Sequence, residues 1–420
     1  MIRSVHSPGS SARISVVVIT YDDQANLDRV LTALDRQVGA EFEVIVADDG
    51  SRLEPVLGRR RYPVQLVRQA DLGFRAAAAR NLGARHAHGD VLLFLDGDTI
   101  PEPGYVATLA AACLAAGARA PGSSAGRGLA VGARRHADFG DVTALPPLPP
   151  PAESMLPDPA WLARGFEATD GLRRPGDRSY RFVISAVLAI TRELFEVTGG
   201  FDESFVGYGG EDWDLANRCY LAGAEFVHEP RAVAWHDGPD VAGRDLASPA
   251  EDERRLAMKN AEIRRVAEVV TEPQARDPRL LWEIPDIAID LDNRGWPPET
   301  TLRVCVGLLD GSDARVWAHD SGLLEGGLWP ASDPRVQAAP IPDAVRARSR
   351  FRVRVDRPVV PATGSLADVC VRGPASYPGL VITHARDAAR GTAPPEGDPT
   401  IVAAVSSDRR LEAVWAGWGH

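Results

Sequence analysis

Two aspartates separated by one glycine are the residues whose types and spacing most directly suggest chemistry. Asp96-Gly97-Asp98 follows the apolar run 91–95, which has the length of one buried strand and no polar alternation. Carboxylate oxygens at the carboxyl end of such a strand suit a divalent cation, Mg²⁺ or Mn²⁺, that also binds phosphate oxygens. Aspartate and glycine are also common in a plain turn after a strand, so these residues alone leave both interpretations open.

A second group of acids follows a pair of glycines. Glu211, Asp212 and Asp214 come after Gly209-Gly210 and open a predicted helix. The helix dipole favours acids in a first turn, which accounts for one of them without any function. Three acids behind two glycines, which let the chain bend tightly, indicate a second chemical cluster. His236 ends a later strand, and its position alone fits either a surface histidine or a metal ligand.

The elements that must position these residues alternate between strand and helix. Apolar runs at 14–20, 42–47 and 90–95 predict strands, and helical patterns at 75–85 and 101–116 follow the same alternation. This order predicts a mainly parallel α/β sheet whose strands end at one common edge. The chain has neither GxGxxG nor GxxxxGK[ST], which disfavours a dinucleotide site and a P-loop.

Changes in composition divide the chain. Residues 1–12 are rich in serine and glycine and are expected to be disordered. Residues 13–272 carry the strand and helix alternation, interrupted at 117–178 by a Pro- and Gly-rich stretch that we interpret as an insertion or flap. Residues 275–420 hold short β-rich runs, which predict the strands of an all-β, sandwich-like domain. These runs are 301–309, 314–318, 351–355, 367–371, 379–383, 400–405 and 411–415. Its tryptophans could stack on sugars, although tryptophan more often occupies core and interface positions.

Composition limits the partners and the location. The formal net charge of −11 argues against nucleic acid or an anionic membrane as the main partner. The four cysteines are far apart without a CxxC pair, as expected of reduced cysteines in a cytoplasmic protein. No apolar segment approaches the ~18 residues of a membrane span. The chain has a single lysine, Lys259, beside many arginines, which we interpret as the coding bias of a high-GC, bacterial genome.

Several of these segments together resemble a known family. They are similar in order and spacing to family 2-type GT-A glycosyltransferases with a galactosyltransferase-type C-terminal segment, as in chondroitin-polymerase-like and β-1,4-galactosyltransferase-like enzymes. The resemblance implies a Rossmann-like mixed sheet flanked by helices, and a metal-dependent, inverting transfer from a nucleotide-sugar, expected to be UDP-linked. The similar segments are residues 14–22, 44–51, 73–83, 91–98, 199–205 and 207–215, with His236.

The resemblance implies roles on the donor side of the site. Asp98 would be the primary ligand of Mn²⁺ or Mg²⁺, His236 would complete the metal shell, and Asp96 would contact the ribose or a metal-bound water. The other residues implied to bind the nucleotide-sugar are Thr20 and Tyr21 beside the uracil and ribose, Asp48 and Asp49 at the uracil N3–H, Arg75 or Arg80 with Asn81 near the phosphates, and Gly97.

The resemblance also implies roles on the acceptor side. Asp212 matches the catalytic base, and Glu211, behind Gly210, matches the residue that holds an acceptor hydroxyl. Tyr208 stands where related enzymes often have tryptophan, and either ring can stack on a sugar. Retaining relatives carry asparagine where this chain has Asp212, so the carboxylate favours inversion.

Two alternatives and the identity of the acceptor stay open at this point. A sugar-1-phosphate nucleotidyltransferase is also α/β with metal-binding acids, but normally opens with a Gly-rich, Arg-containing loop that Thr20-Tyr21-Asp22-Asp23 does not match. A non-catalytic sugar-binding or assembly protein on the same scaffold is the other alternative. The acceptor could be a glycan, a natural product or a peptide, and the β-rich domain could hold copies together in a homo-oligomer.

Overall fold

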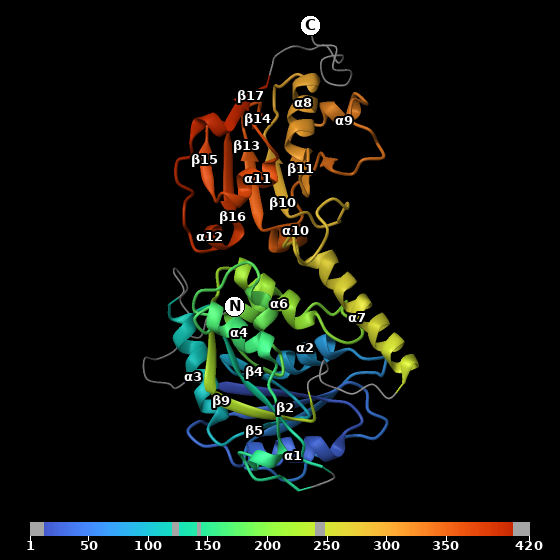
Figure 1. Ribbon diagram of the computed structural model, residues 1–420, viewed down its shortest axis with the longest axis vertical. Coiled ribbons are helices and arrows are strands. Elements are labelled where there is room, and N and C mark those ends of the chain that lie inside the picture. Colours follow the sequence, from blue (N-terminus) through green and yellow to red (C-terminus); the bar gives the residue numbers. More distant parts are fainter. Residues whose placement is uncertain (1–11, 120–125, 141–143, 240–247, 406–420) are drawn as a thin grey trace. The chain divides into compact units, whose positions relative to one another are not determined.

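The computed structural model describes residues 12–119, 126–140, 144–239 and 248–405 (Figure 1). The predicted disordered N-terminus, residues 1–12, lies almost entirely outside this range. Among the described residues, no helix combines the length and the apolar character needed to cross a membrane. The chain forms two compact units, which we call the N-terminal unit (Met1–Tyr220 and Ala224–Arg265) and the C-terminal unit (Leu221–Gly223 and Val266–His420).

The N-terminal unit is built on a sheet whose first half is parallel. Its strands run side by side in the order β3-β2-β1-β4. The connecting helices α1 and α2 lie on opposite sides of these strands, as right-handed crossovers require (Figure 1). The elements are β1 (Ile14–Thr20), α1 (Gln24–Leu34), β2 (Glu43–Asp48), β3 (Val64–Arg68), α2 (Ala76–His86) and β4 (Val91–Asp96).

The second half of this sheet contains antiparallel neighbours, so the sheet is mixed and mainly parallel, as predicted. It continues from β4 in the order β8-β6-β9-β5, and β7 pairs with β6. Helix α3 packs on β6 and β9. The elements are β5 (Thr99–Pro101), α3 (Tyr105–Gly117), β6 (Gly128–Ala137), β7 (Met155–Leu156), β8 (Val187–Thr191) and β9 (Glu225–Asp237).

Strand β6 corrects the interpretation of residues 117–178 as one insertion or flap. Residues 128–137 are an inner strand of the main sheet, and most of them are buried. Their Gly- and Ala-rich sequence has little intrinsic preference for a strand, and the pairing with β8 and β9 imposes that conformation.

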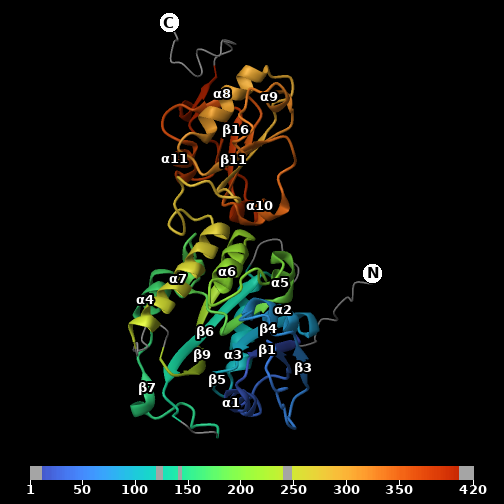
Figure 2. The ribbon, with the colours of Figure 1, turned by 90° about the vertical axis from the view of Figure 1, so that its right-hand side faces the viewer.

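The rest of the N-terminal unit consists of η1 (Ala152–Ser154), α4 (Ala160–Ala168), η2 (Ser179–Phe182), α5 (Arg192–Thr198), most of α6 (Glu211–Leu221) and most of α7 (Pro249–Val269). Figure 2 shows α4, α5, α6 and α7 from a second direction.

The C-terminal unit is rich in strands, as predicted, but the prediction of an all-β, sandwich-like domain is wrong. Six strands form one mixed sheet in the order β12-β11-β10-β13-β16-β15, and helices alternate with them. Residues 301–309 and 367–371, read from sequence as strands, lie in helices α8 and α11. The sheet strands are β10 (Ile287–Leu291), β11 (Ala314–Ala318), β12 (Val336–Gln337), β13 (Phe351–Val355), β15 (Ala375–Tyr377) and β16 (Leu380–His384).

Helices cover both faces of this second sheet. Ile287 and Ile289 point to the larger apolar core with α8, whereas Ala288 and Trp317 pack with Ile341 and Val345 on the other face. The helices are α8 (Pro298–Leu309), α9 (Gly322–Glu325), α10 (Asp343–Arg348), α11 (Leu366–Val371) and α12 (Ala385–Ala389). A separate small pair is formed by β14 (Val359–Pro361) and β17 (Val402–Ala404), after η4 (Pro399–Ile401).

The strand order of the C-terminal unit repeats that of the first half of the N-terminal unit. Strands β12-β11-β10-β13 are parallel and are followed by the antiparallel β16, just as β3-β2-β1-β4 are followed by the antiparallel β8. The loops also correspond, because the amide of His319 donates to Leu291 O as the amide of Asp49 donates to Thr20 O. By this correspondence, His319 in the C-terminal unit occupies the position that Asp49 has in the N-terminal unit. The two units therefore carry different side chains at this equivalent loop position.

Candidate active site

A cavity of about 420 Å³ lies at the carboxyl ends of β1 and β4 in the N-terminal unit. We call it the main pocket. It brings together residues that are far apart in the sequence, from both predicted chemical clusters. The predicted site residues that line it are Thr20, Tyr21, Asp49, Arg80, Asp96, Gly97, Asp98, Tyr208, Gly210, Glu211, Asp212 and His236.

The side of the main pocket that carries the predicted nucleotide-sugar residues depends on a close approach of two strands. A side chain at Gly97 would place its Cβ 2.7 Å from the carbonyl oxygen of Ile19, so only glycine fits between the ends of β1 and β4. Asp49 is fixed beside them, because its Oδ2 accepts from the amide of Arg75 at 2.7 Å and its own amide donates to Thr20 O at 2.9 Å. These contacts hold the predicted nucleotide-facing residues in place before any ligand binds.

Asp98 and His236 meet in the main pocket although 138 positions separate them. Asp98 Oδ2 lies 3.4 Å from His236 Nε2, and His236 Nδ1 lies 3.1 Å from the carbonyl oxygen of Gly238. Because a carbonyl only accepts, a neutral His236 carries its proton on Nδ1 and turns the Nε2 lone pair toward the carboxylate. Two facing lone pairs need a shared cation, either a proton or a metal ion.

The donor set fits a divalent metal ion shared with a substrate. A carboxylate oxygen and an imidazole nitrogen suit Mn²⁺ or Mg²⁺ when phosphate oxygens and water complete the shell. Within the described ranges, no group of three or more His, Cys, Asp or Glu side chains forms a complete cage of its own. The burial of Asp98 opposes its ionisation, but His236, Arg134 and Thr99 outweigh burial and keep its pKa below the usual value.

Arg80 connects the two predicted clusters of acids. Its guanidinium donates through Nη2 to Asp96 Oδ1 and through Nη1 to Glu211 Oε1, each at 2.8 Å. The side chain is 3% exposed and lies over the ring of Phe201. Sequence reasoning placed Arg80 on the phosphate side of the donor; in the structure it holds one acid from each chemical cluster.

Asp212 is an acid of the main pocket whose pKa is raised by its surroundings. It opens helix α6 behind Gly209 and Gly210, whose φ angles of 86° and 90° strongly favour glycine. Desolvation, and next the charge of Glu211, raise the pKa of Asp212 to about 7, against an opposing effect of Arg80. A carboxyl with a pKa near neutrality is suited to take a proton from a sugar hydroxyl at physiological pH.

The raised pKa of Asp212 leads to a pH prediction. A base acts only when deprotonated, so we expect kcat/KM for transfer to fall about tenfold per pH unit below the pKa of about 7. Initial rates at saturating metal ion, measured between about pH 5 and about pH 8, check this. A rate that stays level across this range contradicts the role of Asp212 as the base.

Three predicted site residues do not line the main pocket. Asp48 is fully buried and accepts from Arg68 Nε at 2.7 Å. The side chain of Arg75 donates to Ala70 O, so that only its amide serves the site. Asn81 bonds to both the amide and the carbonyl oxygen of Phe201 and thereby anchors the loop that follows α5. These residues support the site and do not face it.

Other pocket-lining residues were missed by sequence reasoning. Arg134 comes from β6, which was read as part of a flap, and Trp161 comes from α4 in the same stretch. Glu262 lies on the long helix α7, among many other charged residues. Trp213 was a signal that could have been used, because an aromatic residue directly after Glu211-Asp212 stays close to their chemistry.

Comparison with known proteins finds two matches to family models in the N-terminal unit. Residues 15–126 match the model of glycosyl transferase family 2, and residues 175–234 match the model described as the N-terminal domain of galactosyltransferase. Over these residues the N-terminal unit is similar to family 2 glycosyltransferases. The matches confirm the resemblance seen in the sequence.

Curated relatives are similar to the N-terminal part of this chain. Validoxylamine A glucosyltransferase of Streptomyces hygroscopicus subsp. limoneus is 33% identical over 238 residues, which cover 51% of this chain and 50% of that protein. Chondroitin synthase of Pasteurella multocida is 27% identical over 268 residues, which cover 59% of this chain and 26% of that protein. The chain therefore spans half or less of the length of these relatives.

Solved structures give weaker matches. S. aureus TarS 1–349 in complex with UDP aligns with a TM-score of 0.40 at 16% identity, covering 60% of this chain and 65% of that chain. GalNAc-T7 with UDP, GalNAc and Mn²⁺ aligns with a TM-score of 0.40 at 20% identity, covering 64% and 49%. Overlap at this level does not by itself establish a common fold.

Proposed function

We propose that this protein is a metal-dependent, inverting glycosyltransferase that moves a sugar from a UDP-linked donor to a hydroxyl of an acceptor. The observation that carries the proposal is the composition of the main pocket. One cavity contains a carboxylate–imidazole pair suited to a diphosphate-bound cation and a separate carboxyl with a pKa of about 7. A leaving diphosphate and a hydroxyl nucleophile need these two kinds of group.

The donor side of this reaction depends on Asp98 and His236. These two side chains would hold Mn²⁺ or Mg²⁺, which supplies neutralisation of the negative charge on the departing nucleoside diphosphate. Thr20, Tyr21 and Asp49 line the same pocket at the ends of β1 and β2, where the nucleoside would lie. Asp96 is held by Arg80 and keeps one carboxylate oxygen for the donor.

The acceptor side depends on Asp212. Its carboxylate would take the proton of the acceptor hydroxyl while that oxygen attacks the anomeric carbon and the diphosphate leaves from the opposite face. One base and one displacement invert the anomeric configuration. Glu211, fixed by Arg80, would orient the hydroxyl, and Tyr208 offers a ring face to the sugar.

The donor can be tested without knowing the acceptor. We expect slow release of UDP from UDP-sugars such as UDP-glucose, UDP-galactose or UDP-N-acetylglucosamine, dependent on Mn²⁺ or Mg²⁺ and stopped by EDTA, because water can replace the acceptor in the main pocket. Chromatography of the nucleotide products checks this. Formation of UTP and sugar 1-phosphate when pyrophosphate is added would instead indicate a nucleotidyltransferase, and binding of a UDP-sugar without any turnover would indicate a non-catalytic scaffold.

The remaining partners belong to the same proposal. The acceptor is a glycan, a natural product or a peptide side chain, and the name of the validoxylamine A glucosyltransferase offers one small-molecule precedent. Cytoplasmic location and association of copies through the C-terminal unit stay predictions from the sequence. Cell fractionation and sedimentation of the purified chain test them.

A further inference from the structure

Residues of neighbouring strands flank His236 on both sides in the N-terminal unit. His236 lies on β9, and its direct partners in the sheet are His136 of β6 and Thr99 of β5. Directly paired residues project their side chains from the same face of a sheet. His136, His236 and Thr99 therefore form one row across three strands, next to Asp98. We call it the cross-strand row.

The Thr99 end of the cross-strand row has a direct contact with the site. Thr99 is fully buried, and its hydroxyl donates to Asp98 Oδ1 at 3.1 Å. The other oxygen of the same carboxylate, Oδ2, lies 3.4 Å from His236 Nε2. The carboxylate of one candidate metal ligand is thus oriented by a residue of the row.

His136, at the other end of the row, packs against the ring of His236. The two ring centres lie 5.4 Å apart with their planes at 59°. His136 is 2% exposed and does not line the main pocket, whereas Arg134, two residues earlier on the same face of β6, does. His136 can therefore act on the pocket only through His236. Together with Gly238 O, which lies 3.1 Å from His236 Nδ1, it restricts rotation of the His236 ring.

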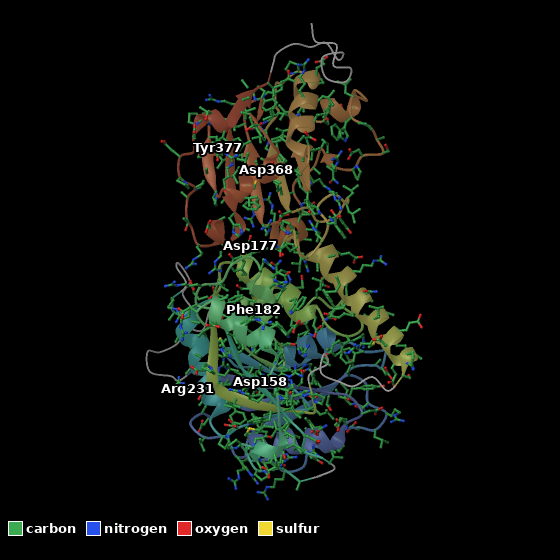
Figure 3. The ribbon with its side chains drawn as sticks, viewed as in Figure 1. Asp158, Asp177, Phe182, Arg231, Asp368 and Tyr377 are labelled. Carbon is green, nitrogen blue, oxygen red and sulfur yellow. The ribbon has the colours of Figure 1, made fainter. Side chains whose placement is uncertain are left out.

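A position that needs only bulk would not favour histidine. Among the described residues, neither ring nitrogen of His136 has a hydrogen-bond partner. Burying unpaired polar atoms is unfavourable, and a leucine or phenylalanine would avoid this cost. The carboxylate of Asp158, which Figure 3 labels, lies within ion-pair range, because its Oδ1 is 3.7 Å from His136 Nδ1. An imidazole at this position can therefore be held by charge as well as by packing.

Asp158 is fixed next to β6 by the chain around it. It follows β7, whose two residues pair with His136 and Ala137, and its carboxylate also accepts from Arg135 Nη1. Burial acts to raise the pKa of Asp158, but His136 and Arg135 outweigh burial and keep this pKa below its usual value. The carboxylate is therefore charged at neutral pH and attracts the Nδ1–H of a neutral His136.

We propose that His136 is a positioning residue of the metal site. Held by the charge of Asp158, its ring keeps the ring of His236 in the orientation that turns Nε2 toward Asp98 and a shared cation. Residues that hold a metal ligand in this way commonly change metal affinity by about 10- to 100-fold. The proposal rests on the proposed function, since the cation belongs to the donor side of that reaction.

The first test uses metal-free protein, so its outcome does not depend on the proposed function. NMR of ¹⁵N-labelled imidazoles at alkaline pH, where histidine is neutral, shows which nitrogen of His236 carries the proton, and the spectrum of His236→Gln assigns the signal. We expect one form, with the proton on Nδ1 facing Gly238 O, in the wild type. His136→Leu, which keeps bulk but has no ring, should show a mixture of both forms. The same form in both proteins, or a mixture already in the wild type, overturns the proposal.

The second test measures the metal-dependent part of donor binding. Calorimetric titration of UDP with Mn²⁺ and with EDTA gives the gain in affinity that the metal supplies. We expect His136→Leu to lower this gain by about 10- to 100-fold and to leave UDP binding in EDTA unchanged. An unchanged gain overturns the proposal. A wild type that gains nothing from Mn²⁺ would instead contradict the proposed metal site, and the protonated form of His236 would still decide the role of His136.

A control on the same strand separates this effect from a general loss of packing. Val131→Ala removes a buried side chain of β6 at a position that pairs with Leu188 and His228. We expect this variant to lower the melting temperature but to keep the gain from Mn²⁺. A gain that falls as far in Val131→Ala as in His136→Leu would mean that any packing defect in β6 has this effect, and it would overturn the proposal.

Asp158→Ala tests the same idea without a change in the core, because the Asp158 side chain is 34% exposed. We expect its gain from Mn²⁺ to lie several-fold below that of the wild type, since the ring of His136 is then held by packing alone. Glu153→Ala, which removes an exposed acid of η1, is the matched control and should keep the full gain. Equal gains in these two variants overturn the role of Asp158.

Discussion

Asp212→Asn should lose transfer while keeping the nucleotide. We expect kcat to fall by about 10²- to 10⁴-fold, the usual contribution of a positioned base, because asparagine has the same shape but cannot take the proton of the acceptor hydroxyl. Binding of UDP with Mn²⁺ should stay near the wild-type value, since Asp98 and His236 are retained. Isothermal titration calorimetry and initial rates of transfer check the two halves of this prediction.

The stability of Asp212→Asn separates a chemical effect from a folding effect. Burial beside Glu211 raises the pKa of Asp212 to about 7, so the folded state is penalised when this group ionises. That penalty is absent when the group is protonated and grows as the pH rises above the pKa of the unfolded chain. Replacing the carboxyl by a neutral amide removes it, and we expect the melting temperature at about pH 8 to be equal to or above that of the wild type.

Asp28→Asn is a matched control for this variant. Asp28 is an aspartate of α1 whose side chain is 51% exposed, and it does not line the main pocket. We expect it to leave transfer, UDP binding and melting temperature unchanged. An Asp212→Asn protein with near-normal turnover removes Asp212 as the base, whereas one that melts early would show that the acid has a structural role.

The N-terminal fold could be predicted because its strands carry continuous apolar runs. Residues 91–95 and 14–20 have the length and the continuous apolar or β-branched character of buried strands, and the acids that follow them mark the sheet edge. Strand β6 was not predictable in this way. Its Gly-Ala-rich residues gain their conformation from β8 and β9 on either side, which is tertiary information that local sequence does not hold.

The prediction of the C-terminal fold failed for a related reason. Thr300-Thr301-Leu302-Arg303-Val304-Cys305-Val306 reads as a strand, because its residues are β-branched and its apolar positions alternate. In the structure Pro298 opens helix α8, and Leu302, Cys305 and Leu309 face the core at helical spacing. A run of this length satisfies both periods, so only the packing partner decides between them.

The sequence predicted the site residues that lie in recognisable motifs at the ends of strands or the start of a helix. It did not predict the contacts of side chains whose direction depends on how a helix is oriented. Asp98 follows a strand, Asp212 lies in the first turn of a helix and His236 lies near the end of a strand, and the structure places all three in the pocket. Arg80 was expected to serve phosphates, but the orientation of α2 directs it between Asp96 and Glu211. Such a bridge depends on the angle of one helix, which no local pattern encodes.

Asp98→Ala should remove the metal-dependent part of donor binding. We expect UDP affinity in the presence of Mn²⁺ to fall by at least about 100-fold, because loss of a direct ligand should exceed the 10- to 100-fold cost typical of losing a supporting residue. Wild-type UDP binding should weaken to a similar level when EDTA removes the metal. Calorimetric titration of UDP with and without Mn²⁺ measures both effects, and equal wild-type binding after EDTA would sink the metal assignment.

A double substitution shows whether Asp98 and His236 act through one ion. Their side chains lie 3.4 Å apart, and the Nδ1 contact with Gly238 O leaves the Nε2 of a neutral His236 facing the carboxylate. If a single cation links them, either substitution alone removes it, and Asp98→Ala with His236→Ala should bind UDP little worse than Asp98→Ala. Losses that add in full would mean that the two residues contact the nucleotide independently. Asp28→Ala, on the exposed face of α1, should show neither the loss nor any change in the effect of EDTA.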